Sequence, residues 1–142
     1  MNTRTMNLRQ GRAKARRGNT LIETALVLGI LLNLAFGTVE FGHFFFIKNT
    51  LQGAAREGGR TAVVSGATNA SVTAAVATVM TANGIASNKY AVATTPADVA
   101  AAASGTQITV TVTCTWSTVG VRPLGMISGT KQVIGTAVMR KE

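Results

Sequence analysis

Few side chains in this sequence could perform acid–base, nucleophilic or metal chemistry. The only cysteine is Cys114 and the only histidine is His43. The acidic residues are scattered along the chain without a close pair: Glu23, Glu40, Glu57, Asp98 and Glu142. A catalytic triad or a metal centre needs several such groups in one place, and one cysteine cannot form an intramolecular disulfide. The inventory therefore predicts no enzyme, no metal site and no cofactor, and it argues against an envelope hydrolase.

Basic residues are concentrated at the N-terminus. The chain has a net charge of +9. Six of its 14 basic residues stand in residues 1–18: Arg4, Arg9, Arg12, Lys14, Arg16 and Arg17. The remaining eight basic and five acidic side chains leave only +3. A basic arm could bind nucleic acid, with an affinity that falls as salt rises. This arm has no interleaved aromatic residues and borders an apolar run, a pattern typical of membrane orientation, so we expect no nucleic-acid partner.

The apolar run is long enough to cross a membrane. Residues 24–39 carry no charge, and the wider apolar stretch 21–47 is interrupted only by Glu23, Glu40 and His43. A bilayer core needs about 20 helical residues. The sequence predicts a transmembrane helix over residues 19–47. A secretory signal peptide would have a shorter apolar core and a cleavage site with small residues, which this run lacks.

The flanks of this helix predict its orientation. The basic residues 1–18 stay in the cytoplasm and residues 48–142 form an exported head. Four phenylalanines at positions 41, 44, 45 and 46 would lie near the outer interface. Glu40 is then a second acid at the membrane edge, and it and His43 are expected to reach water or headgroups.

A stripe of small residues follows one face of the predicted helix. Ala25, Gly29, Asn33 and Gly37 are each four residues apart. Small faces let helix backbones approach closely, and Asn33 could form a hydrogen bond to a neighbouring helix. The stripe predicts lateral packing, although glycine and alanine are common in membrane helices in any case.

The helical pattern continues beyond the membrane segment. An apolar row recurs at steps of three and four: Ile47, Leu51, Ala54, Ala55, Gly58 and Ala62. A polar row lies beside it: Lys48, Gln52, Arg56 and Arg60. The rows predict one helix from about residue 20 to about residue 64, roughly 65 Å long at 1.5 Å per residue. A second helix is predicted over residues 71–82, capped by Asn69 or Ser71 and ended by Gly84.

The C-terminal half changes to a period of two. In residues 107–116, one face carries Ile108, Val110, Val112, Cys114 and Trp116, and threonines alternate with them. Further strands are predicted around residues 90–94 and 131–139. We therefore predict an α+β fold: a long N-terminal transmembrane and amphipathic helix, a second short helix, and a small, mainly antiparallel sheet of about three strands. Cys114 and Trp116 are interpreted as core residues rather than as a reactive thiol or a ligand platform.

The residues before the apolar run resemble a type IV prepilin processing site. Arg16, Arg17 and Gly18 are followed at a distance of five residues by Glu23. The resemblance implies that a prepilin peptidase cuts after Gly18, that Asn19 becomes a methylated first residue, and that Glu23 is the fifth residue of the mature chain.

Two further segments, residues 36–42 and 51–60, resemble TadE-like minor pilins of the tight-adherence (Tad) pilus machinery, and residues 138–142 fit the end typical of that family. The resemblance implies a pilin-like fold and a role in assembly or secretion of a pilus for surface adhesion. It implies as partners the prepilin peptidase, sister minor pilins, the major pilin, the inner-membrane assembly platform and membrane lipid. Thr24 stands where this family often has an aromatic residue, and TadF-like or TadG-like relatives remain alternatives.

If the chain is processed as a prepilin, Glu23 has a role in subunit assembly. Cleavage would leave an amine on Asn19, and we hypothesise that Glu23 pairs with the amine of a neighbouring subunit, which would set the register of the helices. The competing interpretation is that Glu23 simply reaches the cytoplasmic headgroups. For the whole chain, the alternative is an uncleaved single-pass membrane protein with an exported binding domain. Loss of residues 1–18 would separate the two. The predicted location is the bacterial inner membrane with a periplasmic or extracellular head, at the base of the pilus or within the fibre.

Overall fold

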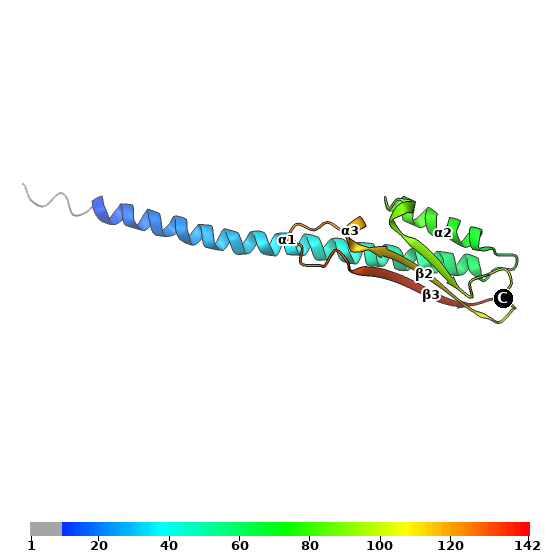
Figure 1. Ribbon diagram of the computed structural model, residues 1–142. Coiled ribbons are helices and arrows are strands. Elements are labelled where there is room, and N and C mark those ends of the chain that lie inside the picture. The colour runs from blue at the N-terminus through cyan, green and yellow to red at the C-terminus, as the bar shows by residue number, and fades with distance from the viewer. Residues whose placement is uncertain (1–9) are drawn as a thin grey trace, which may run out of the picture. The chain divides into compact units, whose positions relative to one another are not determined.

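The computed structural model describes the backbone of residues 10–142 and the side chains of residues 19–142. The chain divides into two compact units, Met1–Thr38 and Val39–Glu142. Its elements follow one another in this order (Figure 1): α1 (Gln10–Ala62), α2 (Asn69–Ala82), the 3₁₀ turn η1 (Ser87–Lys89), β1 (Ala91–Thr95), β2 (Gln107–Thr115), α3 (Trp116–Val119) and β3 (Gln132–Arg140). The predicted α+β fold is confirmed. Of the predicted leader, residues 1–9 lie outside the described residues.

The predicted continuation of α1 as an amphipathic helix is confirmed. Its apolar row is buried from Ile47 to Ala62. Gly53, Gly58 and Gly59 lie in this stretch and do not interrupt the helix. At Gly58, the close packing of α1 requires a residue without a side chain. A Cβ at Gly58 would lie 2.7 Å from Val76 of α2 and 3.3 Å from Val110 of β2. Its missing side chain lets α1 contact the second helix and the sheet at one point.

α2 begins differently from the prediction. The cap is Thr68 rather than Asn69 or Ser71: the Thr68 side chain accepts the amide of Ser71, and the Ser71 hydroxyl accepts the amide of Thr68. This reciprocal pair is a capping box. Asn69 is used elsewhere, because its side chain binds the backbone of Ala97 and Val99. Gly84 follows the helix with φ of 75°, as a residue that ends a helix should.

The sheet is antiparallel with the order β1-β2-β3. Even-numbered residues of β2 are fully buried under α1 and α2, and the alternating threonines are half-buried on the other face. The prediction that Trp116 belongs to this strand was wrong, because the strand ends at Thr115 and Trp116 opens α3. Its amide still pairs with the Lys131 carbonyl at 2.8 Å and its ring is fully buried, so it is the core residue that was expected.

The outer edge of β3 is covered by side chains of α1. The Gln52 side chain donates to the Thr136 carbonyl at 2.6 Å and accepts the Thr136 amide at 3.3 Å. The Lys48 ammonium donates to the Ile134 carbonyl. These contacts occupy backbone groups that an edge strand would otherwise present to another chain. The polar row of α1 therefore protects the sheet rather than only facing solvent.

Candidate functional site

The predicted processing bond lies in α1. The backbone of Gly18 is helical, and the side chain of the next residue, Asn19, is exposed. Glu23 is exposed one turn later, and no described residue forms a salt bridge with it. The hydroxyl of Thr24, which replaces the aromatic residue common in the family, donates to the Thr20 carbonyl at 2.8 Å. Glu23 is therefore placed where a partner outside this chain could reach it, and its pairing stays a prediction.

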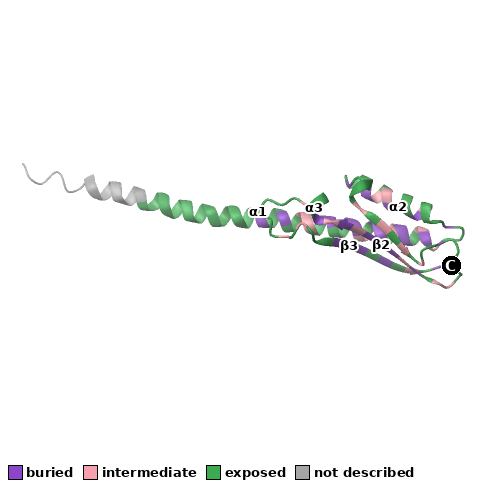
Figure 2. Ribbon diagram, viewed as in Figure 1, coloured by how far each residue is buried: buried purple, intermediate pink, exposed green. Residues whose placement is uncertain are grey.

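The segment after Glu23 is apolar and exposed. Large side chains such as Leu21, Leu26 and Ile30 are 68–73% exposed, and in Figure 2 the ribbon of this part of α1 carries the colour of exposed residues. Among residues 19–142, the part of α1 from Asn19 to Ala62 is the one helix that is long and apolar enough to cross a membrane. Only 6% of its most apolar stretch is buried inside the protein. An apolar surface of this extent needs a nonaqueous environment. The helix indicates a single-pass membrane protein.

The small-residue stripe has open space beside it. Ala25, Gly29 and Asn33 are exposed, whereas Gly37 is buried. A Cβ at Gly29 would meet nothing within 4 Å. The Asn33 side chain donates within its own helix, to the Gly29 carbonyl at 2.9 Å. The face is thus narrow and unoccupied, and its use for lateral packing stays a prediction.

Glu40 is not where the sequence reasoning placed it. Its side chain was expected to reach water or headgroups, but the residue is completely buried. One carboxylate oxygen accepts the Ile127 amide at 2.8 Å and the other accepts the Leu124 amide at 3.3 Å. A carboxylate that leaves water needs such donors. Glu40 therefore clamps the loop between α3 and β3 onto α1, a role that no sequence pattern signalled.

An aromatic cluster lies next to this clamp. His43 is half-buried, and its ring nitrogen Nε2 lies 2.9 Å from the Val119 carbonyl, which can only accept, so Nε2 carries the proton. The His43 ring centroid is 5.7 Å from that of Trp116, and the Phe44 ring meets Trp116 edge-on at 5.4 Å. Trp116 in turn covers Gly120, where a Cβ would lie 2.4 Å from the indole. His43 therefore positions α3 and is not an exposed polar residue.

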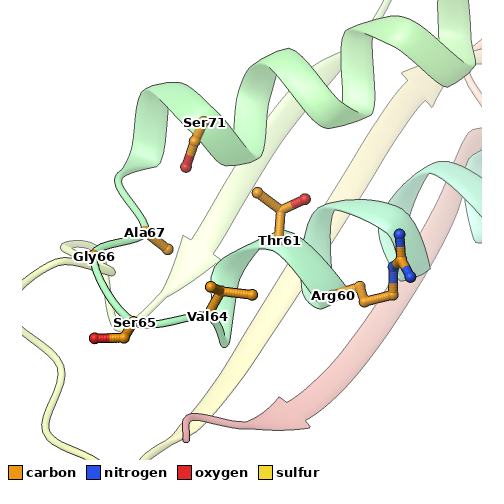
Figure 3. A pocket seen from close by; sticks show the side chains of 7 residues that line it. All are labelled: Arg60, Thr61, Val64, Ser65, Gly66, Ala67 and Ser71. Atoms are coloured by element: carbon orange, nitrogen blue, oxygen red, sulfur yellow. The ribbon is translucent and has the colours of Figure 1, made fainter.

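A depression of about 520 Å³ lies where α1 turns into α2 (Figure 3). Three of its polar side chains already have partners. The Thr61 hydroxyl donates to the Glu57 carbonyl, the Ser71 hydroxyl to the Thr68 carbonyl, and Arg60 pairs with Glu57 at 3.3 Å. The depression holds no acid–base pair and no activated nucleophile.

The remaining candidates for chemistry are dispersed. Within residues 19–142, no three His, Cys, Asp or Glu side chains come together in a way that could hold a metal ion. Cys114 is buried on the apolar face of β2, as expected, and burial raises the pKa of its thiol. A thiol with a raised pKa is a poor nucleophile near neutral pH.

Comparison with known proteins finds a family match for one part of the chain. Residues 18–60 match the family model described as TadE-like protein. The matched segment begins at Gly18, contains Glu23 and Glu40, and covers under a third of the chain. It confirms the resemblance stated from the sequence. No curated protein and no solved structure matches the chain.

Proposed function

We propose that this chain is a minor pilin or pseudopilin of a Tad-type pilus, made as a precursor and cut between Gly18 and Asn19 by a prepilin peptidase. The observation that carries the proposal is the family match over residues 18–60, which begins at the residue expected to precede the cut. The membrane helix after that bond supports it, because a pilin precursor must be held in the membrane while its leader is removed.

The orientation follows from charge. Six basic residues precede the apolar helix, and basic residues are retained on the cytoplasmic side. The leader then faces the cytoplasm, where the resemblance places the peptidase, and the α+β head is exported. The protein is the substrate of an enzyme and has no catalytic role of its own.

Assembly would use the membrane helix. After cleavage, the Asn19 amine and the Glu23 carboxylate stand one helical turn apart, on the exposed surface of α1. A carboxylate inside the membrane is unfavourable unless paired. Pairing with the amine of a neighbouring subunit, beside the open stripe at Ala25 and Gly29, would bring helices together in one register.

The test is the identity of the first residue. The protein is extracted from membranes of cells with and without a prepilin peptidase, and its N-terminus is sequenced. We expect Asn19 as the first residue only in cells that contain the peptidase. Gly18→Leu should stay uncut, whereas the matched control Gly29→Ala, a glycine with open space in the same helix, should be cut normally.

A wild-type chain that still begins at Met1 in cells with an active peptidase would refute the proposal. That result would favour the alternative of an uncleaved single-pass protein with an exported binding domain.

A further inference from the structure

Large apolar side chains remain exposed at one end of the compact unit Val39–Glu142. Three belong to α1 and three to the loop between α3 and β3, and they are 37–60% exposed: Phe41, Phe45, Phe46, Val121, Leu124 and Met126. We call this set the apolar collar. Apart from Val39, which belongs to the membrane helix, the other exposed large apolar side chains of this unit occur singly or in pairs, at Val64 and at Ile134 and Val138. Exposed large apolar side chains grouped in one part of a protein mark a contact with a partner or a membrane.

The collar is held in place by the Glu40 clamp. Glu40 fixes the main chain of the loop at Leu124 and Ile127, and Ile127 packs against the core. The side chains of Leu124 and Met126 are left outside. A shallow depression of about 340 Å³ lies between helix and loop, lined by Phe41, Phe44, Phe45, Met126, Ile127, Ser128 and Lys131. Nothing in the core requires the exposed side chains of this loop to be apolar.

The charges around the collar are positive. The loop between α3 and β3 contains Arg122 and Lys131, both exposed, and residues 119–131 contain no acid. The acid that lies closest in the structure, Glu40, is buried and bonded to the loop backbone. Apolar and aromatic side chains with basic residues beside them are the composition of a surface that lies in the headgroup region of a membrane.

The position of the collar in the chain agrees with a lipid contact. Only Glu40 separates Phe41 from the uncharged residues 24–39 of the membrane helix. Residues 21–40 of a helix span about 30 Å, the thickness of the hydrocarbon core. A helix that enters the bilayer near residue 21 therefore leaves it near Glu40, at the level of Phe41 and Phe45.

We propose that the apolar collar lies in the membrane interface on the head side, with its apolar side chains among the upper acyl carbons and Arg122 and Lys131 on phospholipid phosphates. The loop that Glu40 holds is then a second membrane contact beside the helix, and it limits how far the head can tilt. This inference rests on the membrane-spanning helix and does not depend on cleavage or on a pilus.

The test places a spin label at the collar of the full chain in lipid vesicles. Cys114→Ala removes the native thiol, and Met126→Cys introduces a single labelling site on a residue that is 60% exposed. Val64→Cys is the matched control, because Val64 is 53% exposed and belongs to the turn after α1, outside the collar. Trp116 fluorescence and circular dichroism verify that each variant is folded. The accessibility of each label to oxygen and to a water-soluble nickel chelate is then measured.

For each label we take the ratio of its accessibility to oxygen to its accessibility to the nickel chelate. We expect this ratio to be several-fold higher at residue 126 than at residue 64. The vesicles contain no partner protein, so a residue-126 label as accessible to nickel as the control would overturn the proposal and leave the collar to a protein partner.

A second arm tests the phosphates. The label at residue 126 should be better shielded from the nickel chelate in vesicles that contain phosphatidylglycerol than in vesicles of pure phosphatidylcholine. This increase in shielding should vanish when Arg122→Gln and Lys131→Gln are combined. An increase that persists in this double variant would refute the role of the two basic residues. A chain purified from cells with an active prepilin peptidase that is still uncleaved but shields residue 126 would overturn the proposed processing while supporting the collar.

Discussion

Gly135 of β3 lies against the main chain of α1, and its replacement by alanine tests the contact between helix and sheet. A Cβ at this position would lie 2.3 Å from the carbonyl carbon and oxygen of Leu51 and 2.6 Å from the amide nitrogen of Gln52. Carbon atoms in van der Waals contact stand about 3.5 Å apart, so the helix and the strand would have to separate by about 1.2 Å. Rearrangement of a flexible side chain cannot relieve this clash, because the obstructing atoms belong to the backbone.

The expected cost is at the upper end for overpacking, about 3 kcal/mol of unfolding free energy. Separation would also stretch both hydrogen bonds between Gln52 and Thr136. A domain of this size loses about 4 °C or more of Tm per kcal/mol, so we expect a fall of at least about 10 °C. Gly53→Ala is the control. Gly53 is exposed in α1 with nothing near its missing Cβ, so alanine should stabilise the helix by about 1 kcal/mol.

The assay is thermal unfolding of the detergent-solubilised chain, followed by the fluorescence of Trp116. This residue is the only tryptophan and is fully buried in the head. Fluorescence therefore reports the packing of the head, whereas circular dichroism would be dominated by α1. A Gly135→Ala protein that melts within about 2 °C of wild type would refute the close approach of α1 and β3 on which the magnitude depends.

Three other changes test the clamp, the core and the assembly site. Glu40→Gln should expose the amides of Leu124 and Ile127 to faster hydrogen exchange, because a neutral amide accepts less strongly and its NH₂ group cannot accept at all; unchanged protection would contradict the clamp. Burial raises the pKa of the Cys114 thiol, so the folded chain keeps the thiol proton at a pH where the unfolded chain has lost it. The free energy of unfolding should therefore fall as the pH rises from the ordinary pKa of a thiol toward the pKa in the folded chain. Cys114→Ala should abolish this dependence on pH, as measured by urea unfolding between pH 8 and pH 10. Glu23→Gln should insert into the membrane normally but assemble poorly with pilus components, as measured by sheared-pilus yield, and a normal yield would exclude the pairing with the Asn19 amine.

The elements that depend on local pattern were predictable from the sequence. Strict alternation over residues 107–115 placed Cys114 on the buried face of β2, and steps of three and four placed Leu51 on the buried face of α1. These patterns suffice because a strand or a helix that buries one face must repeat its apolar residues with the period of its backbone. The end of β2 was missed because Trp116 continues the apolar alternation, although its backbone has already turned into α3.

The role of Glu40 could not be predicted in this way. Its partners Leu124 and Ile127 stand more than 80 positions away in the chain. They offer backbone amides, which every residue except proline possesses, so no side-chain type marks them. An acid at the end of an apolar run is explained equally well by exposure to headgroups, and only the folded loop distinguishes the two explanations.

Small residues of α1 serve different purposes in the two units of the chain. In the head, Ala54, Ala55 and Gly58 are buried by the chain's own strands and second helix, so their close approach is already used. In the unit Met1–Thr38, Ala25 and Gly29 are exposed, and the space beside Gly29 is empty. A small face gains packing energy only when another backbone reaches it. No described residue of the same chain occupies the space beside Gly29, and the use of this face by a second helix in the membrane stays a prediction. We therefore predict that helix association uses Ala25, Gly29 and Glu23, and that substitutions in the head affect stability before they affect this association.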